Sequence, residues 1–352
     1  MSVPLRPKRL GPYDIIAKIA GGGMATIYLG RGSDPKDGDR VAAIKVIRQE
    51  LSGDDRYVTM FFDEAKILSQ LEHPSIIRTL DYGMADDQRY IAMELLLGRT
   101  VADVWEAARA RKLLLRVDMA AWIGARVAEG LHYAHELRGE DRKPLHIIHR
   151  DVNPTNIFMT YDGRVKLFDF GLAKARGRRA KSAAGIVKGK VAYLSPEQVT
   201  QETVDRRSDI FTLGTTIWEL STMRRLFKRE NDVETIKAIR VALVPDPRAT
   251  NARFPDALWK ILKRSLARDP KERYATAAEL ASDLDGFVPE DSKRKMPALV
   301  GAILDNLFEG ERERQSGWLR KTSALSPNPT RGTMAPPGPI AAAPRSTKPP
   351  PG

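Results

Sequence analysis

Two segments of this chain carry different hydrophobic patterns, and the contrast constrains the possible fold more than any other feature. Residues 13–97 contain short apolar runs bounded by Gly, Asp or Pro, which are typical of strands, with one helical stretch at 57–71. Residues 98–290 carry mostly helical periodicity. We therefore predict an α+β fold in which a small β-rich lobe precedes a larger helical lobe, with a cleft between them. The expected strands are 13–20, 25–31, 40–47, 76–83 and 89–96, and the expected later helices are 100–112, 117–138, 206–224, 232–243, 256–267 and 276–288.

The chain outside residues 13–290 falls into three parts. Residues 1–12 are a basic lead, and residues 325–352 are a Pro/Ala-rich tail that we expect to be disordered, because it cannot bury enough apolar surface to fold. Residues 291–324 predict an amphipathic helical extension with an apolar stripe. Two interpretations of the stripe stay open: it packs on the body, or residues 299–308 contact a second copy or another partner. The stripe consists of Leu299, Val300, Ile303, Leu304, Leu307 and Phe308.

Composition excludes several classes of protein. The chain has no cysteine, which rules out a disulfide scaffold, a cysteine nucleophile and a thiolate metal site. No run approaches the roughly 20 apolar residues that cross a bilayer. No apolar segment follows the basic N-terminus as it does in a secretory signal. We therefore expect a cytoplasmic protein with no membrane span.

The net charge of +13 suggests an anionic partner such as nucleic acid. This positive charge is concentrated in three segments, however. Residues 172–190 carry +7, residues 311–352 carry +5 and residues 1–12 carry +3, which leaves a net charge of −2 for the rest of the chain. No basic stripe with interleaved aromatic residues follows the expected strands and helices. We therefore expect no nucleic-acid partner. Residues 172–190 instead predict a loop that repels itself until an anion docks there.

A glycine cluster separates the first two expected strands. Glycine lets the backbone turn tightly and approach a bound phosphate, so the segment is either a phosphate-binding loop or a structural hairpin. It is not a Walker A loop, because no Gly-Lys-Ser/Thr follows. The candidate binding residues are Ile19, Ala20, Gly21, Gly22, Gly23, Met24, Ala25 and Ile27.

Lys45 and Glu64 are charged residues on otherwise apolar faces. Lys45 shares one face of its strand with Val41, Ala43 and Ile47, so it either extends to solvent or binds a phosphate or carboxylate. Glu64 lies within the apolar stripe of the helical stretch, where a carboxylate needs a partner. Lys45 has the right sign to be that partner.

Three polar residues occupy turn-like breaks between apolar strands further along the chain. Asp151 and Asn156 belong to Ile-Ile-His-Arg-Asp-Val-Asn-Pro-Thr-Asn, and Asp169 lies thirteen residues beyond Asn156 in Leu-Phe-Asp-Phe-Gly. Their oxygens suit Mg²⁺ held jointly with substrate phosphates. A Tyr-Leu-Ser-Pro-Glu segment follows and ends at Glu197.

In their order and spacing these motifs resemble the protein-kinase signature, and specifically bacterial serine/threonine kinases of the eukaryotic type. The resemblance covers about residues 13–288. It implies a two-lobed protein-kinase fold with the lobes at 13–97 and 98–290. It also implies an enzyme that uses ATP and Mg²⁺, with Mn²⁺ as a substitute, to phosphorylate Ser/Thr hydroxyls of proteins, including its own, in signalling.

The resemblance also implies individual roles. Asp151 is the catalytic base, Asn156 and Asp169 are the Mg²⁺ ligands, and Lys45 holds the α- and β-phosphates while pairing with Glu64. Met93 is the gatekeeper, and Glu94 to Leu96 form the hinge whose backbone meets adenine. Asp209 is the buried anchor of the catalytic loop, and Glu197 pairs with Arg273. By the same resemblance His149 is a packing residue, and we propose no zinc site for it or for His132, His135 and His146.

The chain departs from the family pattern at three places. Ala20 and Ala25 replace the outer glycines of the loop, which we expect to be functional but stiffer. Asn153 stands where a lysine usually contacts the γ-phosphate, and Lys190 stands where a threonine usually contacts that lysine. We hypothesise that Lys190 supplies the missing charge from the opposite wall, although coincidence is the alternative.

The segment from Leu172 to Lys190 corresponds to the activation loop, and Ser182 is its only hydroxyl residue. Arg150 could pair with a phosphate there. Either Ser182 phosphorylation orders the loop or the loop needs no phosphate. A pseudokinase scaffold that binds partners through its C-terminal extension is the alternative function. Tyrosine specificity is less expected, because the Asp151–Asn156 segment lacks the Arg/Ala-rich pattern.

Overall fold

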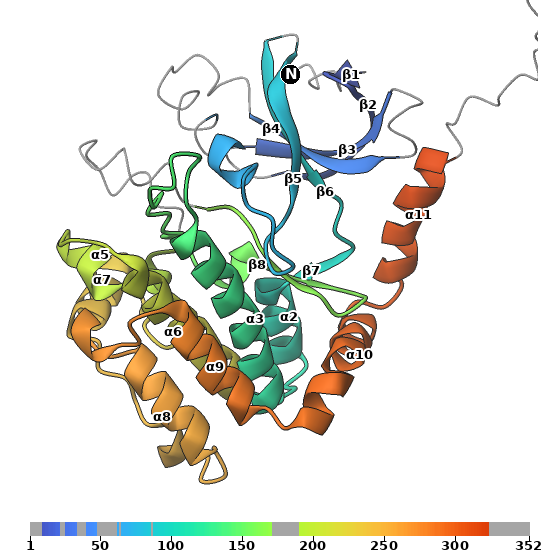
Figure 1. The fold of residues 1–352 in the computed structure, drawn as a ribbon. Coiled ribbons are helices and arrows are strands. Elements are labelled where there is room, and N and C mark those ends of the chain that lie inside the picture. The colour runs from blue at the N-terminus through green and yellow to red at the C-terminus, as the bar shows by residue number, and fades with distance from the viewer. Residues whose placement is uncertain are drawn as a thin grey trace, which may run out of the picture.

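The computed structural model places two lobes one above the other, with helices α10 and α11 along one side (Figure 1). The predicted Ser182 phosphosite and the Pro/Ala-rich tail lie outside the residues that the structure describes. The described residues are 9–21, 25–33, 40–47, 62, 65–85, 87–170 and 190–323.

The smaller lobe is an antiparallel six-stranded sheet with the order β1-β2-β3-β4-β6-β5. The predicted strands are confirmed, except that the strand expected from Ile76 begins at Thr79, while Ile76 forms an isolated bridge with Leu167. Of the predicted helix at 57–71, Phe62 and residues 65–68 are helical, and Ala65, Leu68 and Leu71 are buried. The strands are β1 (Arg9–Leu10), β2 (Tyr13–Gly21), β3 (Ala25–Gly32), β4 (Val41–Ile47), β5 (Thr79–Ala85) and β6 (Gln88–Glu94).

The larger lobe is helical, as predicted. Its helices are α2 (Val101–Ala110), α3 (Val117–Glu136), α5 (Pro196–Thr200), α6 (Arg206–Thr222), α7 (Asp232–Val241), α8 (Asp256–Ser265) and α9 (Ala277–Phe287). The sequence did not predict the short helix α5 or a three-stranded sheet of β7 (Gly98–Thr100), β8 (Ile157–Thr160) and β9 (Val165–Leu167).

Helices α3 and α6 form the centre of the larger lobe. A Cβ on Gly124 of α3 would lie 2.4 Å from a side-chain carbon of Ile217 on α6, so glycine permits this close packing. Helix α6 is buried although it contains several hydroxyl residues. Thr215 and Ser221 are examples, because each donates its hydroxyl to the carbonyl four residues earlier and so satisfies its polar group.

The predicted extension is two helices, α10 (Glu290–Leu307) and α11 (Glu311–Ser323). All six residues of its apolar stripe pack against the large core, with Val300, Leu304 and Leu307 buried. The structure therefore supports packing on the body. Leu299, Ile303 and Phe308 are only partly buried, so contact of residues 299–308 with a second copy or a partner stays a prediction.

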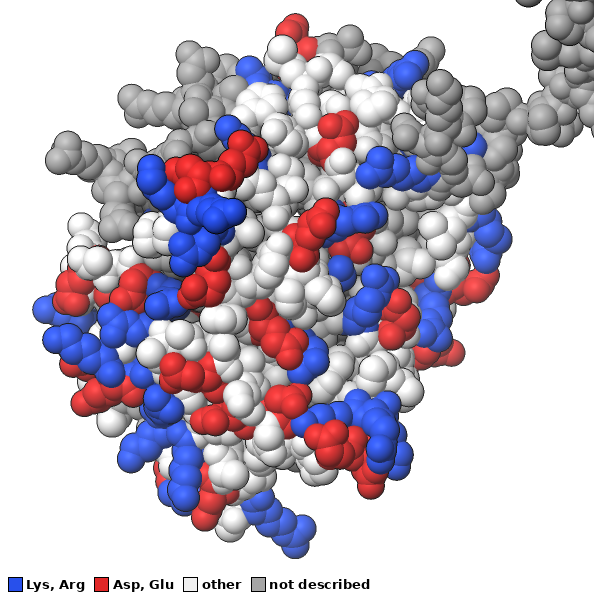
Figure 2. All heavy atoms as spheres, viewed as in Figure 1, with Lys and Arg blue, Asp and Glu red and all other residues white. Residues whose placement is uncertain are grey.

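The surface in Figure 2 carries charges of both signs. Lys and Arg side chains alternate with Asp and Glu side chains over the face shown, as the near-neutral sum of the body predicts. Within the described ranges, no helix combines the length and apolar character needed to span a membrane.

Candidate active site

Lys45 of β4 contacts Asp169, which follows β9. Lys45 Nζ donates a hydrogen bond to Asp169 Oδ1 at 2.7 Å. The strand register places Lys45 between Ile27 of β3 and Ile91 of β6, and from there its ammonium reaches Asp169 of the larger lobe. Glu64, the partner predicted for Lys45, lies outside the described residues. The structure thus joins two of the predicted catalytic residues.

The backbone is strained on both sides of this site. Arg150 has φ of 63° and Asp169 has φ of 54°, both in the left-handed region that is unfavourable for residues other than glycine. Strain of this kind persists only where surrounding contacts hold it. Phe170, which is buried, supplies one such contact by packing its ring 4.4 Å from the ring of His149.

Asp151 and Asn156 lie together in one loop. Asn156 donates its amide to the Asp151 backbone carbonyl at 2.8 Å and to Asp151 Oδ2 at 3.0 Å. The backbone carbonyl of Asn156 in turn accepts a hydrogen bond from the backbone N–H of Phe168 at 3.0 Å. The predicted base and the two predicted metal ligands are therefore linked through two short segments of chain.

Asn153 has a structural role that the sequence did not reveal. Its side chain is buried, donates to the Asp151 carbonyl at 2.8 Å and accepts from the Thr155 backbone N–H at 2.9 Å. It thereby caps the 3-10 turn Pro154–Asn156, for which proline is preorganised. The capping preference of asparagine just before a proline was the available sequence signal.

His149 connects the loop of Asp151 to the segment of Asp169. Its Nδ1 accepts from the Asp151 backbone N–H at 3.2 Å, and its Nε2 lies 3.2 Å from the carbonyl of Phe168. These contacts fit a neutral ring that carries its proton on Nε2. Burial lowers the pKa of His149, so the imidazole remains in this neutral form at physiological pH.

Asp209 anchors the same loop from beneath, as predicted. Its carboxylate accepts the backbone N–H groups of His149 and Arg150, each at 2.8 Å. His135 Nε2 lies 2.8 Å from the same carboxylate. Because Asp209 is fully buried, its three partners supply the hydrogen bonds that water cannot.

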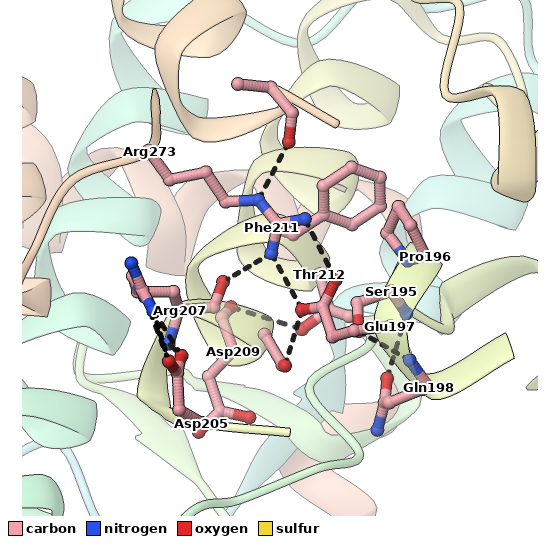
Figure 3. A network of polar contacts seen from close by, with 12 residues as sticks. Ser195, Pro196, Glu197, Gln198, Asp205, Arg207, Asp209, Phe211, Thr212 and Arg273 are labelled. Carbon is pink, nitrogen blue, oxygen red and sulfur yellow. Dashed lines mark hydrogen bonds and ion pairs between the residues drawn. The ribbon is translucent and has the colours of Figure 1, made fainter. Parts of the chain in front are cut away.

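Glu197 and Arg273 form the predicted ion pair, shown in Figure 3. The guanidinium of Arg273 donates to both carboxylate oxygens of Glu197, at 2.8 and 2.9 Å, and lies over the ring of Phe211. Burial acts to raise the pKa of the Glu197 carboxyl, but the hydrogen bonds and charge of Arg273 outweigh it, and the pKa is lowered. The pair joins α5 to the segment before α9.

The predicted gatekeeper and the first hinge residue end β6, and the rest of the hinge follows it. Met93 is buried and packs with Ala65 and Ile77, and Leu96 lies partly buried against the same cluster. The Glu94 side chain accepts from Lys166 Nζ of β9 at 2.6 Å. This ion pair joins the end of β6 to the larger lobe, and no sequence pattern identified Lys166.

The glycine cluster lies between β2 and β3, which pair antiparallel. Ile19, Ala20 and Gly21 end β2, and Ala25 and Ile27 begin β3. Gly22, Gly23 and Met24 lie outside the described residues, so the loop's approach to phosphate remains a prediction. Lys190 begins the 3-10 helix Lys190–Tyr193.

Tyr193, at the end of this 3-10 helix, belongs to a polar cluster that the sequence analysis did not identify. Tyr193 donates its hydroxyl to Glu219 Oε2 at 2.7 Å, and Arg225 donates to the same oxygen at 2.9 Å. Arg225 also pairs with Glu106 and lies 3.8 Å from the Trp105 ring centre. Burial raises the pKa of Tyr193. These contacts fix the chain directly after residues 171–189.

Comparison with known proteins gives matches over most of the chain. A family model described as protein kinase domain matches residues 13–284. The tyrosine-protein kinase MasK of Myxococcus xanthus is 36% identical over 302 residues, or 86% of this chain and 47% of MasK. The serine/threonine-protein kinase PrkC of Bacillus subtilis is 33% identical over 274 residues, or 78% of this chain and 40% of PrkC. The chain thus spans less than half the length of these two relatives.

Among solved structures, the kinase domain of Mycobacterium tuberculosis PknI is similar to this chain. It superposes with a TM-score of 0.59 at 25% sequence identity and covers 79% of this chain and 97% of PknI's. The likeness confirms the predicted fold, with a curled sheet in the first lobe and helices in the second.

Proposed function

Because the chain belongs to the protein kinase domain family, we propose that it transfers the γ-phosphate of ATP to serine and threonine hydroxyls of proteins. The relatives confirm the resemblance to bacterial kinases of the eukaryotic type. One observation carries the proposal: His149 contacts both the Asp151 backbone and Phe168, and the adjacent Asp169 contacts Lys45. The proposed base and the proposed phosphate-binding cation are thus held in one network.

The proposed mechanism assigns one task to each residue. Lys45 binds the α- and β-phosphate oxygens, while Asp151 orients the attacking hydroxyl and accepts its proton. The hinge backbone from Glu94 to Leu96 binds adenine. Because phosphoryl transfer requires positioning and charge stabilisation more than covalent chemistry, the network around His149 serves the reaction by holding these groups still.

Asn156 and Asp169 fit a divalent cation. One supplies an amide oxygen and the other a carboxylate oxygen, which are hard ligands of the kind that Mg²⁺ prefers and Mn²⁺ also accepts. Their segments are joined by the hydrogen bond from Phe168 N to Asn156 O. When bound, the ion neutralises the negative charge of the phosphate oxygens.

Tyrosine phosphorylation is the second candidate, because a similar relative is named as a tyrosine-protein kinase. The loop that begins at Asp151 favours Ser/Thr specificity, since it lacks the Arg/Ala-rich pattern expected of tyrosine kinases. A scaffold without activity is not favoured, because Lys45 contacts Asp169 and Asn156 contacts Asp151.

A direct experiment tests both activity and specificity. Wild type and Asp151→Asn are incubated with labelled ATP, Mg²⁺ and a general protein substrate, and the phosphorylated residues are mapped by mass spectrometry. We expect phosphoserine and phosphothreonine with wild type and background label with Asp151→Asn. Phosphotyrosine alone would establish the second candidate, and absence of label from wild type with several substrates would favour the scaffold.

We further propose that Lys190 replaces the missing lysine at Asn153. The support is the paired change in sequence, together with the buried capping role that occupies the Asn153 side chain. Activity is compared for Lys190→Ala and for the double variant Asn153→Lys/Lys190→Thr. A strong loss in the first and a higher activity in the second, which also lacks the Asn153 cap, support the proposal, whereas near-full activity of Lys190→Ala contradicts it.

The regulation proposed for Ser182 follows from charge. A phosphate there would dock on the basic residues of 172–190 and on Arg150, whose backbone is fixed by Asp209 and whose carbonyl accepts from Gln198 Nε2 at 3.0 Å. Phosphopeptide mapping of active enzyme tests this, because an unmodified Ser182 excludes the switch. We further propose that the catalytic domain comprises residues 13–290 and, since ATP is its proposed substrate, that it acts in the cytoplasm.

A further inference from the structure

Helix α11 contacts the chain directly after the proposed adenine-binding hinge. Gln315 Oε1 accepts from the backbone N–H of Gly98 at 2.8 Å, and Gln315 Nε2 donates to the Gly98 carbonyl at 3.1 Å. Gln315 is buried, and 217 residues separate it from Gly98. One side chain therefore satisfies both backbone groups of a residue that adjoins the hinge.

Glycine is required at position 98 for this arrangement. Its φ is 158°, and a Cβ there would lie 2.0 Å from the Met159 carbonyl oxygen. The backbone consequently runs tight against β8 on one side and against Gln315 on the other. The preceding Leu97 is also held, because its carbonyl accepts from the Tyr161 N–H at 3.0 Å.

The first turn of α11 binds the larger lobe. Glu311 pairs with Arg99 of β7 at 2.5 Å, and the Arg99 guanidinium lies 5.0 Å from the ring centre of Phe308. Arg312 donates to the Tyr161 carbonyl at 2.6 Å and lies over the Tyr161 ring. These contacts fix the lower end of α11 relative to the larger lobe.

The last turn of α11 reaches the smaller lobe. Arg31 of β3 donates to the Thr322 carbonyl at 3.0 Å, and Thr322 is buried. At 1.5 Å per residue, the helix spans about 16 Å between Glu311 and Thr322. Figure 1 shows α11 rising from α10 toward the sheet. A single helix thus contacts both lobes and Gly98, which lies two residues after the hinge.

We propose that Gln315 is a positioning residue for nucleotide binding, and that α11 is a second connection between the lobes that holds the hinge in its nucleotide-binding shape. The proposal rests on the function proposed above, because it assumes that adenine binds at Glu94 to Leu96. Loss of the Gln315 contacts leaves the Gly98 N–H and carbonyl unpartnered, which loosens the hinge backbone. Nucleotide affinity then falls, while the chemistry at Asp151 is preserved.

The test uses full-length Gln315→Leu, which keeps the volume but removes both hydrogen bonds, and Arg320→Ala as an exposed control on the same helix. Hydrogen exchange of residues 95–100 is measured without nucleotide. We expect faster exchange at the Gly98 amide in Gln315→Leu and wild-type exchange in the control. Unchanged exchange in Gln315→Leu overturns the proposal, and this arm needs no catalytic activity.

Nucleotide binding provides the second arm. For Gln315→Leu we expect the ATP KM and the ADP Kd to rise about fivefold, with kcat within about twofold of wild type. Arg31→Gln, which lies outside the core around Gln315, is expected to shift both constants in the same direction. A variant that only melts earlier, with unchanged KM and Kd, overturns the positioning role. If wild type itself binds no ADP, the proposed function fails, while the exchange result still decides whether Gln315 holds the hinge.

Discussion

Lys45 Nζ and Asp169 Oδ1 lie 2.7 Å apart although 124 residues separate them in the chain. The pair joins the sheet of the smaller lobe to the segment after β9 of the larger lobe. Both side chains are partly exposed, at 20% and 43%, so the pair contributes little to stability. Its importance lies in placing a cation and a carboxylate at the boundary where ATP is proposed to bind.

Removing either member of this pair is expected to abolish activity without unfolding the protein. Lys45→Met and Asp169→Asn should each lower phosphoryl transfer at least about 100-fold, with unfolding free energies within about 1 kcal/mol of wild type. The exposed Lys143→Met is the control and should keep full activity. Retention of activity by Lys45→Met, measured with labelled ATP, would contradict the assigned role.

Asn153→Ala removes the cap of the turn Pro154–Asn156 and should lower stability by about 1 kcal/mol. It should also lower activity, because the same side chain holds the Asp151 carbonyl. Asn251→Ala is a matched control, since Asn251 accepts a comparable backbone hydrogen bond from Arg253 in an exposed loop. Urea unfolding and kinase assays compare the two, and equal activity of both variants would show that the cap does not serve catalysis.

Arg273→Met leaves the Glu197 carboxylate buried without its main partner. Breaking a buried ion pair of this kind destabilises a protein by about 3–5 kcal/mol, which urea denaturation can measure. Arg294→Met provides the contrast, because its pair with Asp291 is 75% and 79% exposed and should contribute less than about 1 kcal/mol. Similar losses in both variants would mean that burial does not distinguish the pairs.

Stability should fall as the pH drops below about 6.5, the ordinary pKa of histidine. Burial lowers the pKa of His149, and burial also lowers that of His73. In this range the unfolded chain therefore binds protons that the folded chain does not, and the stability present at neutral pH is progressively lost.

His149→Phe tests this pH dependence. The variant keeps an aromatic ring beside Phe170 but cannot titrate, so its unfolding free energy should fall less steeply between pH 7 and 5. The limiting difference in slope is about 1.4 kcal/mol per pH unit. Parallel curves for wild type and His149→Phe would exclude His149 as the source.

The sequence by itself determined the two lobes, their order and most of their elements. Hydrophobic periodicity and turn residues act locally, so strands such as β4 and helices such as α3 could be predicted from neighbouring residues alone. The motif residues Asp151, Asn156 and Asp169 could also be identified from the sequence alone. Their residue types and spacing resemble a known family, and the predicted Glu197–Arg273 pair followed from the same resemblance.

Only the tertiary structure decided which distant groups meet. The pairing of Lys166 with Glu94, the hydrogen bonds of Gln315 to Gly98 and the contact of Arg31 with Thr322 each join residues far apart in sequence. No local pattern encodes such contacts, because they depend on how whole helices and sheets pack. The apolar stripe at residues 299–308 shows the same limit: its spacing predicted a helix, but only the tertiary packing placed that helix against the larger lobe.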